Sequence, residues 1–278
     1  MRAARRQRID AANDAFQLAL SLHANRKQRR RQGRFVVEGV RNINAAVERG
    51  WPIDSFWYSG EQRLSDWARV LLEAPVAQMT YELPADLLAR LSQRDEPSEL
   101  IALVRMPPDD LARIPEAGAD TLLLAFDRPV MPGNLGAVIR SGDALGANGV
   151  VVTGHGADVY DPQTVRASAG SLFRVPVVHG GAMGAVAAWI ERLRGSAPGL
   201  QVVGTSTGAA RPVQEQDLAG PVLVVLGNES RGLGHGWRQQ CDELVRIPLR
   251  GEADSLNVAA AAAIVLYEID RQRRQRAA

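Results

Sequence analysis

The feature that most constrains the fold of this sequence is a set of short, uninterrupted apolar runs in its second half. They read TLLLAF, GVVVT, RVPVV, LQVVGTS and PVLVVLG, at residues 121–126, 149–153, 174–178, 200–206 and 221–227. Such runs are typical of strands that are covered on both faces, as in a parallel sheet between layers of helices. Helical stretches are expected between and after them, at 136–146, 163–171, 183–195 and 258–274. The second half is therefore predicted to be an α/β domain with a parallel sheet.

The first half carries a shorter α/β pattern of its own. Strands are predicted for FVVEGV, IDSFWYS, VAQMTY and LIALVRM, at residues 35–40, 53–59, 76–81 and 100–106. Helices are expected between them, at 41–50, 61–73 and 84–92. The segment 107–120 is rich in Pro and Asp with little periodicity, so it is the predicted linker. The predicted organisation is a basic arm (1–34), a small α/β domain (35–106), the linker (107–120) and a larger α/β domain (121–278).

Length and composition agree with this division and exclude several classes of protein. A chain of 278 residues suits one large or two modest domains. Its single cysteine, Cys241, cannot form an internal disulfide, which favours an intracellular protein and here the cytoplasm. No run approaches eighteen apolar residues and no apolar segment follows the basic amino terminus, so neither a membrane span nor a secretion signal is expected. The four histidines have no metal-ligand spacing, so no metal site is predicted.

The net charge of +2 conceals an uneven distribution along the chain. Residues 1–50 hold 12 Lys or Arg against 4 Asp or Glu, a balance of +8, and the other 228 residues have a balance of −6. A basic segment on an acidic body suggests a polyanion such as RNA as a partner. The simpler alternative is a solvated basic stretch. The residues predicted to contact the polyanion are Arg26, Lys27, Arg29, Arg30, Arg31 and Arg34.

Three polar, glycine-rich segments follow predicted strands, which is where open α/β sheets place their ligands. In the first, residues 129–149, Asn134 and Gly136 lie at a helix start and Arg140 one turn inside. A cap, a permissive glycine and a snorkelling arginine would explain these three without any function.

The second segment, VLVVLGNESRGLG (222–234), lacks both the Gly-Lys-Ser/Thr of a phosphate-binding loop and the GxGxxG spacing of a dinucleotide fold. The third, residues 244–268, joins a strand to the last helix through Ser255 and Asn257, both of which are good helix-start residues. Nucleoside triphosphates and NAD are therefore disfavoured as ligands.

Taken together and in this order, the three segments resemble the SpoU family, also called TrmH, of S-adenosylmethionine-dependent RNA ribose 2′-O-methyltransferases. The resemblance covers residues 121–272, including a connecting stretch, 159–178, that carries Arg166 and Ser168. The family's motifs correspond to Asn134, Gly136 and Arg140, then to Leu226-Gly227-Asn228-Glu229 with Gly232, and then to Ile247-Pro248-Leu249 with Ser255-Leu256-Asn257-Val258.

The first half adds a finer resemblance. Residues 25–72 are similar to the avilamycin-resistance branch of the family, whose substrate is a uridine ribose in large-subunit ribosomal RNA. Many members carry an amino-terminal RNA-binding domain similar to ribosomal protein L30e. The resemblance therefore implies an L30e-like domain at 35–106 and a SPOUT-type methyltransferase domain with a deep trefoil knot at 121–278.

The resemblance also implies site residues, a cofactor and a homodimer in which the first motif completes the partner's site. Contacts with S-adenosylmethionine are expected at Thr205, Leu226, Gly227, Asn228, Ile247, Leu249, Leu256 and Asn257. Catalytic roles are expected for Asn134, Arg140, Glu229, Ser255 and Asn257, and Arg166 is expected to join the RNA contacts.

The role of Arg140 needs a chemical argument. The family places this arginine at the reacting hydroxyl, sometimes as a general base, but a guanidinium stays protonated and offers no acceptor. Our hypothesis is that Arg140 clamps the phosphate beside the target ribose and stabilises negative charge developing on its oxygen. Glu229 would hold the motif loops, Asn134 would place Arg140, and Ser255 and Asn257 would orient the substrate or cofactor.

The predicted function is methylation of a ribose 2′-hydroxyl in RNA, with 23S ribosomal RNA as the expected target. A transfer RNA methyltransferase of the same family and a non-catalytic RNA-binding or ribosome-assembly protein are the alternatives. The sequence leaves open which nucleotide is modified, whether the substrate is naked RNA or an assembled subunit, and whether methylation serves antibiotic resistance or housekeeping.

Overall fold

The computed structural model describes residues 5–92 and 96–277, and its chain divides into two compact units. The first unit comprises Met1–Pro108 and Tyr160–Arg174, and the second comprises Asp109–Val159 and Val175–Ala278. The segment Tyr160–Arg174 lies inside the predicted domain 121–278 but groups with the first unit. Residues 1–4, 93–95 and 278, which fall in the predicted arm and the two predicted domains, lie outside the described residues.

The second unit is built on a parallel sheet with the strand order β10-β12-β9-β11-β6-β7-β8. Every neighbouring pair in this order is parallel. The strands are β6 (Leu122–Asp127), β7 (Gly149–Thr153), β8 (Val177–His179), β9 (Gln201–Thr205), β10 (Arg211–Pro212), β11 (Val222–Leu226) and β12 (Glu243–Arg246). The helices are α6 (Pro132–Ala144), α8 (Met183–Ser196), α9 (His235–Gln240) and α10 (Val258–Ala277), with the short 3-10 turns η1 (Leu111–Arg113) and η3 (Val213–Glu215).

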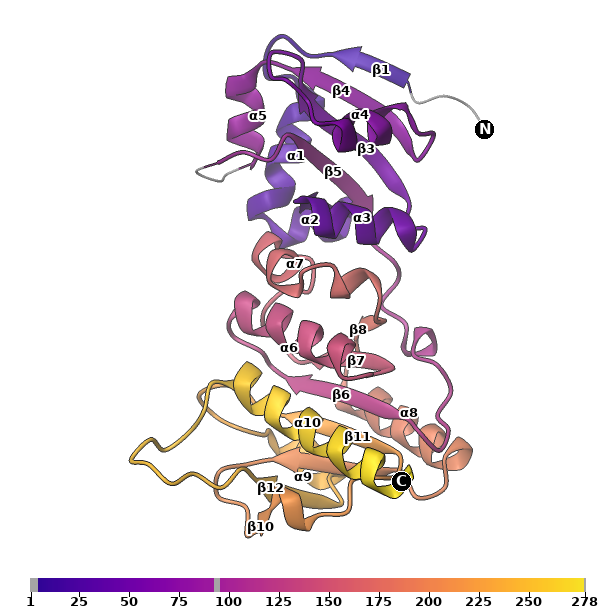
Figure 1. Cartoon of the computed structure of the whole chain (residues 1–278), viewed down its shortest axis with the longest axis vertical. Coiled ribbons are helices and arrows are strands. Elements are labelled where there is room, and N and C mark those ends of the chain that lie inside the picture. The colour runs from indigo at the N-terminus through magenta and orange to yellow at the C-terminus, as the bar shows by residue number, and fades with distance from the viewer. Residues whose placement is uncertain (1–4, 93–95, 278) are drawn as a thin grey trace. The chain divides into compact units, whose positions relative to one another are not determined.

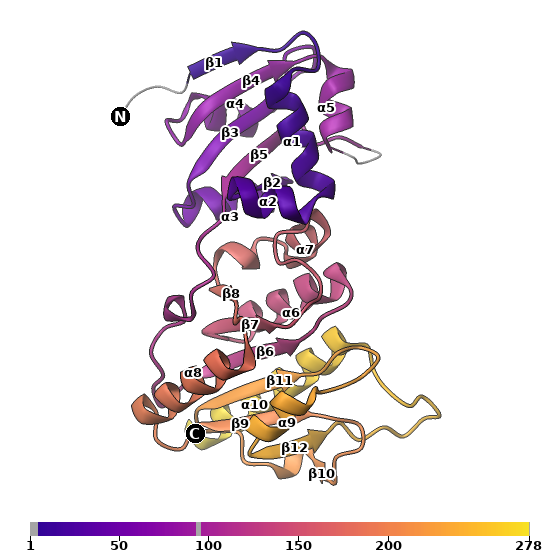
Figure 2. The ribbon, with the colours of Figure 1, turned by 180° about the vertical axis from the view of Figure 1, so that it is seen from behind.

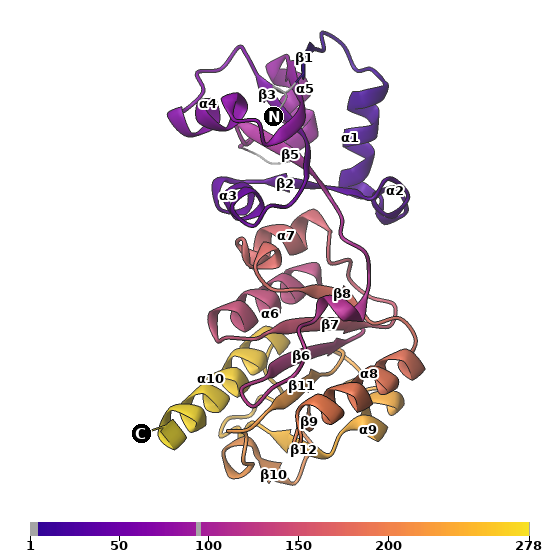
Figure 3. The ribbon, with the colours of Figure 1, turned by 90° about the vertical axis from the view of Figure 1, so that its right-hand side faces the viewer.

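Helices cover both faces of this sheet. Figure 3 shows α6 and α10 on one face and α8 and α9 on the other. All residues of β6, β7 and β11 are buried, and Trp189 of α8 and Trp237 of α9 share a core with them. Ile114 and Ala117, from the predicted linker, are buried in the same core. The predicted α/β fold with a parallel sheet is confirmed, whereas the trefoil knot stays a prediction from the family.

The strand order brings the polar segments together. Strand β11 lies between β9 and β6, and β12 lies on the far side of β9. Since parallel strands end at the same edge of a sheet, the segments after β6, β9, β11 and β12 emerge side by side. Within residues 5–92 and 96–277, no helix combines the length and apolar character needed to cross a membrane.

The first unit has a mixed sheet with the order β1-β4-β3-β5-β2, in which β5 runs antiparallel to β2 and β3 (Figures 1 and 2). Its strands are β1 (Arg5–Arg8), β2 (Arg34–Glu38), β3 (Ile53–Ser59), β4 (Ala77–Leu83) and β5 (Leu100–Arg105). Its helical segments are α1 (Asp14–Ala24), α2 (Arg26–Gln32), α3 (Val40–Glu48), α4 (Asp66–Glu73), α5 (Ala85–Ser92), α7 (Pro162–Ser168) and η2 (Ser171–Phe173).

The segment predicted as a basic arm folds as part of this unit, which corrects the prediction. Strand β1 pairs with β4, and Asn13 caps α1 by accepting a hydrogen bond from the Phe16 amide at 3.0 Å. Phe16, Ala19 and Leu22 recur at helical spacing and are buried in the core of the unit. The arginine-rich segments on either side, residues 2–8 and 26–34, led to the assignment of the whole stretch as one basic arm.

Aromatic packing explains why Tyr160–Arg174 belongs to the first unit. The ring of Phe35 on β2 lies 4.7 Å from that of Tyr160, and the rings of Trp51 and Phe173 lie 5.1 Å apart. The Trp51 indole also donates a hydrogen bond to the Phe173 carbonyl at 3.2 Å. Large aromatic contacts of this kind bury much apolar surface, so they fix the segment to β2 and to the loop that carries Trp51.

Candidate functional site

The polar segments of the second unit surround a cleft of about 600 Å³, a size typical of small-molecule sites. Its walls come from the ends of β9 and β12, the loop after β11, and the start of α10 with the loop before it. The lining residues that the sequence had singled out are Asn134, Thr205, Gly227, Asn228, Glu229, Ile247, Leu249, Ser255, Leu256 and Asn257. The cleft therefore unites most of the predicted catalytic and cofactor residues.

Glu229 ties the loop after β11 to the start of α6. Its carboxylate accepts hydrogen bonds from the amides of Val130 at 2.8 Å and Met131 at 3.1 Å, and from the Asn134 side chain at 3.2 Å. A carboxylate is favourable at this position because backbone N–H groups at a helix start carry partial positive charge. These contacts are those expected of a residue that holds the motif loops.

Asn134 extends the network to α10. Its side-chain oxygen accepts a hydrogen bond from the Asn257 amide at 3.0 Å, and Asn257 in turn accepts one from the Ala259 backbone amide at 2.9 Å. Asn134 therefore lies within the first turn of α6 as a link between loops rather than as a helix cap, since Met131 occupies the cap position. One chain of hydrogen bonds now joins all three motif segments.

The loop 228–232 is closed on itself, which explains its glycines. Asn228 and Gly232 exchange backbone hydrogen bonds at 3.1 and 2.9 Å, and the Asn228 side chain accepts from the amides of Ser230 and Arg231. A Cβ at Gly227 would lie 2.6 Å from the Gly232 carbonyl carbon, so only glycine fits there. Gly232 adopts a φ of 63°.

The cofactor residues proposed from the family contribute in different ways. Thr205 ends β9, and its hydroxyl donates to the Val225 carbonyl at 3.1 Å. The Leu226 side chain is fully buried in the core, so this residue can offer only its backbone to a ligand. By contrast, Leu249 and Leu256 line the cleft and are each 38% exposed, so their side chains can offer apolar surface to a ligand.

Sequence reasoning missed several lining residues, among them Ser206, Thr207, Val245, Arg246 and Asp254. Ser206 and Thr207 continue the polar end of β9 directly after Thr205, so the Thr-Ser-Thr run was a usable signal. Arg246, the last residue of β12, gave no such signal, because its guanidinium donates to the carbonyls of Ala209 and Ala210, which are distant in sequence.

Arg140 does not join the cleft. It lies on α6 and is exposed, and it is absent from the residues that line the cleft in the described part of the chain. A single chain therefore separates the predicted catalytic arginine from the predicted cofactor residues.

The predicted RNA-binding arginines divide between surface and interior. Arg30 and Arg31 are exposed on α2, as is Lys27, and Arg26 is half-buried. Arg29 is only 2% exposed, and its guanidinium donates to the carbonyls of Leu22 and His23, each at 2.8 Å. Because it caps the carboxyl end of α1 and pairs with Asp161 at 3.4 Å, Arg29 is corrected from an RNA contact to a structural residue.

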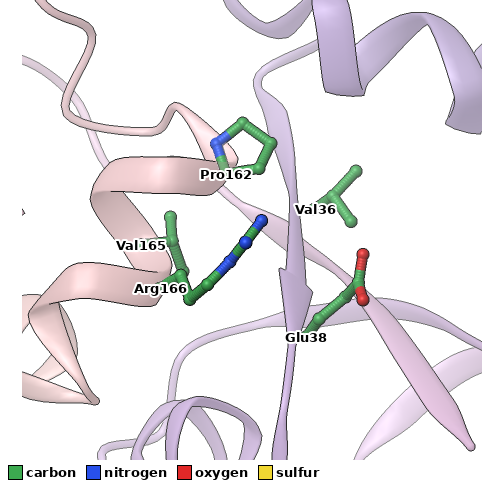
Figure 4. Close-up of a pocket in the computed structure, with 5 residues that line it drawn as sticks. All are labelled: Val36, Glu38, Pro162, Val165 and Arg166. Carbon is green, nitrogen blue, oxygen red and sulfur yellow. The ribbon is translucent and has the colours of Figure 1, made fainter. Parts of the chain in front are cut away.

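Arg34 and Arg166, which were also predicted to bind RNA, each lie near an acidic side chain. Arg34 pairs with Asp54 at 3.1 Å, which offsets its charge. Arg166 is exposed on α7, and Figure 4 shows its side chain extending toward β2, beside Val36 and Glu38, where these residues line a small pocket. Among the residues that the structure describes, no cluster of three or more His, Cys, Asp or Glu could hold a metal ion.

Comparison with known proteins identifies the chain's relatives. Residues 121–267 match the model of the SpoU rRNA Methylase family, and residues 13–102 match the SpoU L30e-like domain. The 23S rRNA (uridine(2479)-2′-O)-methyltransferase of Streptomyces viridochromogenes is 47% identical over 268 residues, which cover 96% of this chain and 93% of the relative. The 23S rRNA (guanosine(2553)-2′-O)-methyltransferase RlmP of Bacillus subtilis is 29% identical over 88% of this chain and 91% of its own length.

A solved structure leads to the same family. The crystal structure of the SpoU methyltransferase AviRb from S. viridochromogenes, in complex with the cofactor AdoMet, superposes with a TM-score of 0.90 at 46% identity. The match covers 95% of this chain and 99% of AviRb. With both halves matched by their family models, the motifs gathered at one cleft and a relative similar along almost its whole length, the chain belongs to the SpoU rRNA methylase family.

Proposed function

We propose that this protein transfers a methyl group from S-adenosylmethionine to the 2′-hydroxyl of a uridine ribose in 23S ribosomal RNA, in the cytoplasm. The observation that carries this proposal is the junction of the three motif segments through Glu229, Asn134 and Asn257 at one cleft. The AviRb relative, a 23S rRNA uridine methyltransferase similar along 93% of its length, supports the choice of RNA and base.

The cleft suits the proposed cofactor. Val245, Ile247, Leu249 and Leu256 offer an apolar surface for an adenine ring, while the Thr205 hydroxyl and the backbone of the loop after β11 offer polar groups. When bound, S-adenosylmethionine supplies an electrophilic methyl group on its sulfonium. The chain's own contribution is to hold this ligand and the ribose in a fixed mutual orientation, which can lower a barrier by ~7–11 kcal/mol.

In the transfer, the 2′-oxygen bonds to the methyl carbon as the carbon–sulfur bond breaks, and the hydroxyl proton leaves to solvent or to a substrate phosphate. Arg140 cannot accept this proton, because a guanidinium has only donors. It instead binds the phosphate next to the target ribose and stabilises negative charge on the attacking oxygen. Ser255 and Asn257 orient the ribose or the cofactor from the start of α10.

A homodimer brings Arg140 to a cleft. Helices α6 and α10 pack on each other, and around them the second unit exposes Val130 and Met131 before α6 and Ile264 and Tyr267 on α10, each 40% to 57% exposed. Exposed apolar side chains on a pair of packed helices suit an interface with a second copy of the chain. A second copy of the chain covers them, and its Arg140 then completes the cleft.

The first unit binds the RNA through its basic surface. Lys27, Arg30 and Arg31 on α2 face solvent, so they are positioned for phosphate contacts that do not depend on sequence. Arg166 on α7 is the further contact in this unit.

The experiment that tests the function is methyl transfer from radiolabelled S-adenosylmethionine to ribosomal and transfer RNA, followed by mapping of the modified nucleotide. We expect one 2′-O-methyluridine in 23S RNA. Label in transfer RNA alone would establish the transfer RNA alternative. Cofactor binding by calorimetry without any methylation of RNA or ribosomal subunits would indicate a non-catalytic binder.

Variants of Arg140 test its role. Arg140→Ala is expected to lower kcat by about 100- to 1,000-fold, the usual effect of removing a donor to a developing oxyanion. Arg140→Lys retains a positive charge and is expected to recover part of the RNA affinity. If Arg140→Ala kept full turnover, both proposed roles of Arg140 would be wrong. If it lost turnover but bound RNA like the wild type, the phosphate clamp would be wrong.

A further inference from the structure

Arg128, at the junction of β6 and the first motif loop, has an unusual backbone conformation. Its φ is 49°, in the left-handed region that non-glycine residues seldom adopt, and such a conformation persists only where its surroundings hold it. The Arg128 amide donates to the Thr153 carbonyl at 2.9 Å, and the Arg128 carbonyl accepts from the Asn228 side chain at 2.7 Å. The left-handed conformation of Arg128 therefore directs its own carbonyl toward the loop after β11.

The guanidinium of Arg128 binds the other end of the loop 228–232, at Gly232. It donates to the Gly232 carbonyl at 3.2 Å, while a bidentate pair with Asp127, at 3.0 and 2.8 Å, fixes its orientation. The Asp127 carboxylate is buried and also accepts the Gly234 amide at 2.7 Å. Hydrogen bonds that involve a charged group are stronger than those between neutral groups. Asp127 and Arg128 therefore hold residues 228, 232 and 234 in place.

Two glycines leave the room that the Arg128 side chain needs. A Cβ at Gly154 would lie 2.4 Å from the Arg128 Cγ. A Cβ at Gly234 would lie 2.9 Å from an Asp127 carboxylate oxygen and 3.0 Å from an Arg128 guanidinium nitrogen. Any larger residue at Gly154 or Gly234 would collide with the Arg128 side chain or its Asp127 partner.

The first motif loop and the loop 228–232 hold each other in place. Arg128 holds the loop 228–232, and Glu229 of that loop holds Val130, Met131 and Asn134, which follow Arg128 along the chain. We propose that Arg128, paired with Asp127, is a positioning residue for methyl transfer: it sets the loop 228–232 so that Glu229 can hold Asn134. This inference rests on the proposed function, because it assumes that Glu229 and Asn134 serve catalysis.

Arg128→Gly is the decisive variant. Glycine adopts the left-handed conformation freely and keeps the backbone bonds to Thr153 and Asn228, so the variant removes the Arg128 side chain, with its guanidinium, without straining the backbone. We expect kcat to fall by about 10- to 100-fold, as for a small misplacement within a reacting assembly, and the Kd for S-adenosylmethionine to rise severalfold. The KM for RNA is expected to stay within about twofold of wild type, because Arg128 lies outside the proposed RNA surface.

The matched control is Arg194→Ala. Arg194 on α8 is 33% exposed, close to the 31% of Arg128, and it also pairs with carboxylates, those of Glu191 and Asp242. Those partners are away from the cleft lining, so kcat and cofactor affinity should not change. A purely structural role for Arg128 would lower Tm while leaving kcat per folded molecule at the wild-type value, and that result would overturn the proposal.

A double-mutant cycle with Glu229→Gln separates this inference from the proposed function. If Arg128 acts through Glu229, Arg128→Gly should cost less than about threefold in kcat once Glu229 is already changed. Equal losses in both backgrounds would overturn the positioning role while leaving the function intact. Wild-type kcat in Glu229→Gln would instead contradict the proposed role of Glu229 itself.

Discussion

At the residue scale, burial shifts the pKa of a side chain as strongly as a charged neighbour does, and His23 illustrates this. It is 6% exposed, and burial, followed by the charges of Arg29 and Arg166, lowers its pKa to about 4. The Glu38 carboxylate, 3.6 Å away, is outweighed by these effects. His23 is therefore neutral in the folded protein at physiological pH.

The lowered pKa predicts a pH-dependent stability. The unfolded chain protonates His23 near pH 6.5, before the folded chain does, so stability is complete above that pH and is lost as the pH falls toward 4. Between pH 7.5 and pH 5.0 the loss should be about 2 kcal/mol. Urea unfolding at the two pH values should show this difference in wild type and a smaller one in His23→Gln.

His235, which is exposed, provides the control for this measurement. The variant His235→Gln should keep the wild-type difference between the two pH values. An equal difference in wild type and His23→Gln would mean that another group causes the acid sensitivity.

At the scale of elements, Arg273 and its neighbour Gln272 bind the end of α10 to the backbone of the second unit. Arg273 donates to the carbonyls of Asp120 and Thr121 at 3.0 Å and of Gly220 at 2.9 Å, just before β6 and β11 begin. We expect Arg273→Met to lower the free energy of unfolding by about 2–3 kcal/mol, because charged donors to carbonyls are worth more than neutral ones.

The neighbouring Arg274 is the control for α10. It is largely exposed and pairs with Asp270 on the same helix, so Arg274→Ala should change the free energy of unfolding by less than about 0.5 kcal/mol. Denaturant titrations of both variants measure the difference. Similar losses for the two would contradict the fastening role of Arg273.

Helix α2 should dominate the salt dependence of RNA binding. Replacing both Arg30 and Arg31 by alanine should reduce the slope of log Kd against log salt concentration by about 1.4–1.8, since each phosphate contact contributes ~0.7–0.9. Arg192→Ala, an exposed arginine on α8, should leave the slope unchanged. Filter binding over a range of salt concentrations would show whether α2 or another basic surface holds the RNA.

The elements differ in how well the sequence predicted them. Strands β6, β7, β8, β9 and β11 were predictable because burial on both faces leaves continuous apolar runs. The short strands β10 and β12 carry no such run. Helix α1 was missed because its apolar sequence, DAFQLALSLHA, lies between two arginine-rich segments, residues 2–8 and 26–34, and the whole stretch was assigned to one basic arm. Helix α9 was missed because it spans only His235–Gln240 and buries a single residue, Trp237, which is too short for a periodic pattern.

The candidate site shows a similar division. The motif resemblance predicted the family, which the family models confirm, and most of the cleft lining. The burial of Arg29 and the separation of Arg140 from the cleft were not predictable, because they depend on packing between segments distant in sequence. The catalytic roles of Asn134, Arg140, Glu229, Ser255 and Asn257 stay predictions.

At the scale of the whole molecule, the proposed homodimer would make activity a property of two chains, because Arg140 lies outside the cleft of its own chain. We predict that Arg140→Ala and Asn257→Ala, each inactive alone, restore activity when their protomers are mixed after dissociation. One cleft of each mixed dimer then has an intact Asn257 and receives an intact Arg140, so random mixing should return on the order of a quarter of wild-type activity in a twofold dimer.

The same mixture distinguishes the alternatives. If Arg140 served the cleft of its own chain, each cleft in the mixed dimer would carry a defect and no activity would return. Sedimentation of the wild type as a monomer at working concentrations would exclude a shared site altogether.

The placement of Tyr160–Arg174 also bears on how such a protein can be divided or recombined. Since this segment belongs to the first unit but is flanked by the second, the chain passes between the units three times. A fragment beginning at Asp109 would keep Tyr160 and Phe173 without the rings of Phe35 and Trp51 that cover them. The first unit therefore cannot be exchanged as one continuous segment. Any recombination that replaces it must also replace the fifteen residues Tyr160–Arg174, which interrupt the sequence of the second unit.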